Sequence, residues 1–148
     1  MTASRGRSVA LLALVPLLAG CFVCVPGRYE VPIPPAGAPP EEVVAAYIDA
    51  ALGKDSETIA AVMVPETDFD NEFNGPFSPF RHWDAAADID IGDSYAADLD
   101  CPPGRECRRV SVSMHLCGDT GYPTGDFVEP FVLHWVTDRW LVSGFGAG

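Results

Sequence analysis

The chain has 148 residues, enough for one domain once any targeting segment is set aside. Its residues are 48% hydrophobic, which is sufficient for a packed core and argues against a chain that is disordered throughout. The 9 basic and 21 acidic residues give a formal net charge of −12, which argues against binding to the phosphates of nucleic acid.

Residues 1–20 have the pattern of a signal peptide. Arg5 and Arg7 form a short positive segment, and about twelve uncharged residues follow from Val9 onward. This run is too short to cross a bilayer core about 30 Å thick, which takes about 20 helical residues. The junction Leu18-Ala19-Gly20-Cys21 resembles the lipobox of bacterial lipoproteins. The resemblance implies cleavage between Gly20 and Cys21 and acylation of the cysteine thiol.

The charge of the processed chain supports an acyl anchor. Without Arg5 and Arg7, the 9 basic residues fall to 7 against 21 acidic ones, so the formal net charge becomes 7 − 21 = −14. Anionic lipid repels such a body, and stable attachment then requires acyl chains such as palmitate. We therefore expect a membrane anchor on Cys21 at the extracytoplasmic face of a bacterial membrane. The alternative is a plain secretory signal that has a cysteine nearby.

Residues 21–40 are expected to form a proline-rich tether. Six prolines lie between positions 22 and 40, and proline fixes φ and lacks an amide donor, so the stretch favours an extended spacer. At about 3.1 Å per residue, such a spacer could hold the domain up to about 60 Å from the bilayer.

Residues 41–148 are expected to fold as a single domain that begins with two helices. Apolar residues between Val43 and Leu52 recur at helical spacing, and Gly53 is a natural stop. Asp55 is a suitable cap for a second, shorter helix that Pro65 ends. Residues 68–83 have no period and hold four phenylalanines. This segment is predicted to be a loop or broken helical crossover that packs its rings against the core.

The rest of the chain has the alternation of β-strands. Apolar residues alternate with polar ones from Val110 to Leu116, and a similar period appears at 89–91 and 131–136. A turn at 137–139 leads into a last strand at 140–145, and such short connections favour antiparallel pairing. The sequence therefore predicts an α+β domain in which two helices pack on a curved antiparallel sheet of about four strands.

Two segments resemble the nuclear transport factor two-like superfamily. They are Tyr47-Ile48-Asp49-Ala50-Ala51-Leu52 with Gly53-Lys54-Asp55, and the final hairpin with Asp138-Arg139-Trp140-Leu141-Val142-Ser143-Gly144. The resemblance implies a sheet that wraps around the helices as a cone, with a pocket at its open end. It matches no catalytic motif residue by residue, so it transfers no activity.

Four cysteines remain once Cys21 carries lipid, and disulfides persist in an oxidising compartment. Cys101 and Cys107 flank a turn-like linker between two expected strands. They are predicted to face each other across a hairpin and form a disulfide that stabilises the fold by about 2 kcal/mol. The sequence leaves Cys117 to pair with Cys101, Cys107 or Cys24, or to stay free.

The patterns that suggest metal binding are incomplete. The three distal cysteines lack the paired short spacing of zinc ligands. Asp68, Asp70 and Glu72 are spaced like the start of a calcium loop, but Phe73 and Pro79 stand where glycine and glutamate are required. We expect neither a metal ion nor a cofactor.

The histidines are the remaining candidates for chemistry. His82 lies close to Asp84 in the crossover, and His115 and His134 lie on predicted strands. A histidine and an aspartate that share a pocket can transfer a proton on a small carbonyl or steroid-like substrate. The alternative for each histidine is a surface position or a core position with its hydrogen bonds made.

Two classes of function fit these patterns. The first is a lipid-anchored, non-catalytic ectodomain that binds a small apolar ligand or another envelope protein. The second is a small pocket enzyme of isomerase or hydrolase-like type that uses a His/Asp pair. An enzyme requires a histidine or carboxylate directed into a concave apolar pocket with a strongly perturbed pKa. An entirely apolar pocket favours binding, and a filled interior favours partner contact. We favour the binding class.

Overall fold

The computed structural model describes residues 23–97, 101–118 and 125–146. The expected cleavage and lipidation site at Gly20 and Cys21 lies outside the described residues. In chain order the elements are β1 (Val25–Pro26), α1 (Pro40–Gly53), α2 (Ser56–Val62), α3 (Phe69–Asn74), α4 (Pro79–His82), β2 (Ala85–Ala96), β3 (Cys107–Cys117), β4 (Gly125–Val136) and β5 (Arg139–Phe145).

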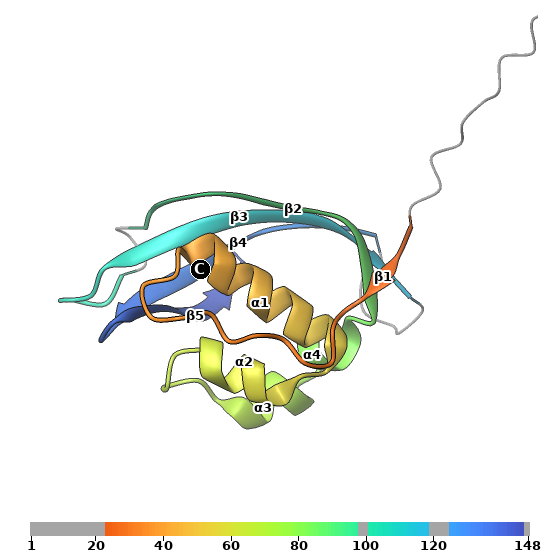
Figure 1. The fold of residues 1–148 in the computed structure, drawn as a ribbon, viewed down its shortest axis with the longest axis horizontal. Helices are drawn as coiled ribbons and strands as arrows, with labels where there is room; N and C mark the ends of the chain where they lie inside the picture. The colour runs from red at the N-terminus through yellow and green to blue at the C-terminus, as the bar shows by residue number, and fades with distance from the viewer. Residues whose placement is uncertain (1–22, 98–100, 119–124, 147–148) are drawn as a thin grey trace, which may run out of the picture.

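The strands form one curled antiparallel sheet in the order β1-β2-β3-β4-β5, so each strand pairs with its neighbour in sequence. The helices lie on the concave side of this sheet, with α1 next to the strands and α2 and α3 further out (Figure 1). The predicted α+β class and the antiparallel sheet packed on N-terminal helices are confirmed. The expected crossover contains two short helices, α3 and α4.

Helix α1 is the centre of the fold. Pro40 occupies its first turn, followed by Glu41 and Glu42, whose charges complement the positive end of the helix dipole. Nine of its residues are buried, so nearly the whole circumference of the helix contacts protein. Gly53 is the last helical residue, and Lys54 takes the left-handed conformation that ends the helix, with φ of 60°.

Helix α2 begins as predicted at Asp55. The Asp55 carboxylate accepts a hydrogen bond from the Thr58 amide at 3.0 Å, which satisfies one of the free amides at the helix start. The same carboxylate accepts from the Val31 amide at 2.9 Å, and the Thr58 hydroxyl donates to the Val31 carbonyl at 2.9 Å. The cap therefore also fixes the N-terminal segment onto the domain.

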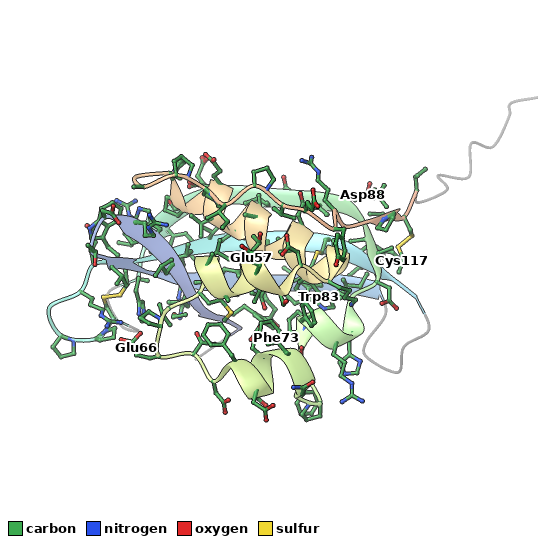
Figure 2. All side chains as sticks on the ribbon, turned by 60° about the horizontal axis from the view of Figure 1, so that its bottom comes forward. Glu57, Glu66, Phe73, Trp83, Asp88 and Cys117 are labelled. Carbon is green, nitrogen blue, oxygen red and sulfur yellow. A yellow bond between two sulfur atoms is a disulfide. The ribbon has the colours of Figure 1, made fainter. Side chains whose placement is uncertain are left out.

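The core lies between α1 and the concave face of the sheet. Val110, Val112, Met114 and Leu116 of β3 are buried there, as their alternation predicts. Each fully buried side chain of this size stabilises the fold by about 1.5–3 kcal/mol. Aromatic rings extend the core toward one end of the sheet, where Trp83 lies edge-on to Phe127 with ring centroids 5.1 Å apart. Figure 2 shows Trp83 in this interior position, between the helices and the sheet.

The N-terminal segment packs closely against the domain. Residues 21–40 are predicted to form a free tether, but from Cys24 onward they lie on the domain because they have partners there. Val25 pairs with Ala86 of β2, and Val31 joins the core at 9% exposure. At Gly27 a Cβ atom would lie only 2.3 Å from the amide nitrogen of Gly53, so only glycine allows this approach.

Two disulfides close opposite ends of the sheet. Cys101 and Cys107 are joined as predicted, with their Cα atoms 5.5 Å apart. Cys24 is joined to Cys117, the last residue of β3, with a Cα–Cα distance of 6.2 Å. The sequence left the partner of Cys117 open, and the structure pairs it with Cys24, the candidate furthest from it in sequence. Within the described ranges, no helix is both long and apolar enough to span a membrane.

Candidate functional site

A pocket of about 390 Å³ opens between α1, α3 and the second half of β5, and we call it the α3–β5 pocket. Two of the segments that line the pocket are hydrogen-bonded to each other. The residues that follow α2 pair with β5, and the Val64 amide donates to the Val142 carbonyl at 2.9 Å. The lining combines apolar side chains with a polar rim and comprises Tyr47, Met63, Val64, Glu66, Thr67, Asp68, Asn71, Glu72, Val142, Ser143, Gly144 and Phe145.

The most distinctive contact in this pocket joins Tyr47 to Glu72. Tyr47 projects from α1 and is 0% exposed, and its hydroxyl donates to Oε1 of Glu72 at 2.5 Å. Burial raises the pKa of Glu72, and the hydrogen bond from Tyr47 offsets only part of that rise. Burial therefore makes the protonated form of Glu72 more accessible than that of an exposed glutamate.

Local sequence explains how α3 presents Glu72. The Asp68 side chain caps the start of α3 by accepting from the Asn71 amide at 3.3 Å. At the other end the Gly75 amide donates to the Asn71 carbonyl at 2.8 Å, and a side chain at Gly75 would collide with that oxygen. The Ser78 hydroxyl also donates to the Glu72 carbonyl. Both ends of this short helix are thus fixed.

Phenylalanines hold α3 against the domain. Phe73 stacks on Phe69 with ring centroids 5.9 Å apart and meets Phe80 of α4 edge-on at 4.9 Å. Figure 2 shows Phe73 below Trp83, directed from α3 toward the interior. Three of the four phenylalanines that were predicted to pack against the core therefore do so, and they position the helix that bears Glu72. The prediction is wrong for Phe77, which is 74% exposed.

The rim of the pocket includes an ion pair. Nη2 of Arg105 lies 2.5 Å from Oε1 of Glu66, and Nη1 lies 3.4 Å from Nδ1 of His134. The hydrogen bond from Arg105 lowers the pKa of Glu66, so this carboxylate stays ionised. Burial, together with the charge of Arg105, lowers the pKa of His134, so this histidine stays neutral. Glu66 is thereby held at the edge of the pocket by the loop that the Cys101–Cys107 disulfide closes.

The predicted catalytic candidates do not meet in a pocket. Asp84 lies 3.5 Å from the Lys54 ammonium, in an ion pair, and His82 lies on α4. His115 does pair with an aspartate, Asp126, at 3.1 Å, but the Asp126 side chain is 86% exposed. His134 contacts Arg105, as described above. None of these three histidines lines the α3–β5 pocket.

Tyr47 and Glu72 are the residues that the sequence reasoning missed. The sequence pattern places Tyr47 in the apolar stripe of the first helix and Glu72 in an incomplete calcium-loop spacing. A buried tyrosine requires a hydrogen-bond partner, so its place in an apolar stripe was a usable signal. The partner lies 25 residues further on, in a segment without a period, and no local pattern identifies it.

A larger hollow of about 510 Å³ lies between residues 29–33 and the start of α2. Two of its charged groups are already engaged, because Asp55 accepts hydrogen bonds from Val31 and Thr58 and Lys54 donates to the carbonyls of Phe80 and Trp83. This hollow is therefore part of the packing of the N-terminal segment. In the part of the chain that the structure describes, no group of three or more His, Cys, Asp or Glu side chains is arranged to hold a metal ion.

The chain was compared with protein-family models, with curated proteins and with solved structures, and none of them matches it. The fold and the pocket define its class as an α+β domain in which a curled sheet encloses helices and leaves a small cavity beside them.

Proposed function

We propose that the protein is a lipid-anchored extracytoplasmic domain that binds a small, mainly apolar ligand in the α3–β5 pocket. The observation that carries this proposal is the Tyr47–Glu72 hydrogen bond of 2.5 Å in the wall of a cavity of about 390 Å³. Ligand pockets typically have volumes of about 300–1,000 Å³ and combine apolar walls with a few placed polar groups. Glu72 supplies the polar group that would orient the ligand.

Two further observations support the location and the fold family. The disulfides Cys24–Cys117 and Cys101–Cys107 are stable in an oxidising compartment, which agrees with the lipobox pattern that ends at Cys21. A curled antiparallel sheet with helices on its concave side is also compatible with the cone of the nuclear transport factor two-like superfamily. We therefore propose that the domain belongs to this superfamily.

Binding is tested with N-phenyl-1-naphthylamine, a fluorescent probe that has apolar rings and one N–H donor. We expect saturable fluorescence with the wild type and binding about tenfold weaker in Glu72→Gln, because the neutral amide oxygen is a weaker acceptor than a carboxylate. Glu57→Gln is the matched control, since Glu57 is exposed on α2, outside the α3–β5 pocket. Binding that does not saturate, or that is equal in both variants, would contradict the proposal.

The anchor is tested independently of the pocket. Labelled palmitate is expected to be incorporated into the wild type, and Cys21→Ala is expected to release the protein from membranes or to leave it unprocessed. Mass spectrometry of the N-terminal peptide measures both the cleavage and the acyl mass. A membrane-bound, mature-sized Cys21→Ala product would show that another feature holds the protein there.

A pocket enzyme is the second candidate, and the raised pKa of Glu72 favours it. Because the described histidines lie elsewhere, Glu72 is the group that would move the proton. The test is exchange of the α-hydrogens of cyclohexanone in heavy water, followed by NMR. Exchange that the wild type accelerates and Glu72→Gln does not would assign proton transfer to this pocket, and exchange at the buffer rate leaves the binding function alone.

A further inference from the structure

The Cys24–Cys117 disulfide lies very close to the proposed lipid anchor. Only three peptide units separate Cys24 from Cys21, and a chain of that length spans at most about 11 Å. Cys24 is bonded to the last residue of β3 across a Cα–Cα distance of 6.2 Å, so this end of the sheet lies within about 17 Å of the acylated residue. A free spacer that led to Glu41 would instead reach about 60 Å.

The contacts that follow Cys24 also hold this segment in place. Val25 pairs with Ala86 at the start of β2, and Gly27 lies against the end of α1. Figure 1 shows β1 at the end of the sheet beside α4, whereas the connection between β2 and β3 lies at the opposite end. The anchor therefore joins the domain at one defined end.

This end carries exposed apolar side chains close to the anchor. Val23 is 75% exposed, Val25 58% and Tyr29 77%. Exposing three large apolar side chains within seven positions to water is unfavourable. The same side chains are favourable at the boundary between lipid headgroups and acyl chains, where tyrosine is enriched. Arg28, which lies between Val25 and Tyr29 and is also exposed, is paired with Asp49 at 3.7 Å.

We propose that the disulfide seats this end of the domain directly on the bilayer surface, with Val23, Val25 and Tyr29 in contact with lipid. This inference rests on the lipid anchor of the proposed function. The acyl chains supply the affinity for the membrane. The disulfide fixes the orientation of the domain on the bilayer, because it restricts the motion that a flexible tether would allow. The partner of the apolar patch formed by Val23, Val25 and Tyr29 is therefore the membrane.

Orientation is tested with the acylated protein in phosphatidylcholine vesicles, with the photo-cross-linker p-benzoylphenylalanine introduced at Tyr29 or at Pro103. Pro103 is exposed in the 101–107 loop at the far end of the sheet and is the matched control. We expect several-fold more lipid cross-linking from position 29 than from position 103. Equal cross-linking from the two positions would overturn the inference.

The role of the disulfide is tested with the cross-linker at Asp126, which is 86% exposed at the start of β4, and again at Pro103. Removing the bond with Cys24→Ser and Cys117→Ser should reduce the difference between these positions, whereas Cys101→Ser with Cys107→Ser should leave it unchanged. The comparison of positions in the wild type decides the proposal even if the first variant unfolds. Mass spectrometry of Cys21 separates the two possible failures, because absent acylation refutes the anchor, whereas acylation without oriented cross-linking refutes only the seating.

Discussion

The two ends of the sheet are each closed by a disulfide, but the two bonds cross very different lengths of chain. Cys24 and Cys117 are 93 residues apart in sequence, whereas Cys101 and Cys107 are 6 apart. In the chain-entropy model a loop of about 100 residues gives about 4.7 kcal/mol of stabilisation, and a very short loop gives about 2 kcal/mol. The long bond thus restrains the whole fold, while the short one shapes a loop. The same chemistry serves two purposes in one small domain (Figure 2).

The largest effect is expected when the long bond is removed. The double variant Cys24→Ser and Cys117→Ser should lose about 4–5 kcal/mol of unfolding free energy, because the unfolded chain regains the freedom of a long loop. Urea denaturation followed by tryptophan fluorescence measures this change. A loss no greater than that of the short-bond variant would remove the distinction between the two ends.

A smaller loss is expected from Lys54, at the same end as the long bond. Its ammonium donates to the carbonyl oxygens of Phe80 at 2.6 Å and Trp83 at 2.5 Å. Lys54→Met keeps the apolar stem but removes both hydrogen bonds and should lower the unfolding free energy by about 2–3 kcal/mol. The matched change at the far end, Arg105→Met, should have a smaller effect, because Arg105 binds an exposed carboxylate. Equal losses in urea denaturation would argue against this contrast.

Removal of the short bond by Cys101→Ser and Cys107→Ser should cost about 2 kcal/mol. The same variant should loosen the loop that brings Arg105 to Glu66. The NMR-measured pKa of Glu66 should therefore rise toward its ordinary value, since the hydrogen bond that lowers it is weakened. An unchanged Glu66 titration in a destabilised variant would show that the loop keeps its conformation without the bond.

The smallest effect concerns pH. The folded pKa of Glu72 is raised above its ordinary value of 4.5, so the folded state binds this proton more tightly than the unfolded state does. The stability from this group is present below pH 4.5 and is lost as pH rises through the folded pKa. The free energy of unfolding of the wild type, relative to that of Glu72→Gln, should fall as the pH rises from 4 to 7. A constant difference across this range would mean that Glu72 titrates normally.

The parts of the fold that the sequence predicted are those with local signals. The apolar stripe of α1, the Asp55 cap and the alternation of β3 each lie within a few residues, and so does the turn that pairs Trp135 with Trp140. The short disulfide belongs to the same class. In each case the pattern and the partner are close together in the chain.

The missed features depend on partners that lie far apart in sequence. Strand β1 is two residues long, and nothing local marks it. Strand β2 runs over Ala85–Ala96, but the sequence showed alternation only around Ile89 and Ile91, because this outer strand buries few side chains and its register shifts twice. The Tyr47–Glu72 contact has the same origin, since it joins a periodic helix to a segment without a period.

The nesting of the two disulfides has a consequence for how the chain matures. If the chain is exported as proposed, it emerges from its N-terminus, and Cys101 becomes available to Cys24 sixteen residues before Cys117 (117 − 101 = 16). Joining cysteines in order of arrival would link Cys24 to Cys101 and Cys107 to Cys117, and neither bond is native. The first thiol must therefore wait until β3 has crossed, or a mispaired bond must be exchanged afterwards by thiolate attack. A host without an isomerase for such bonds would be a poor source of correctly joined protein.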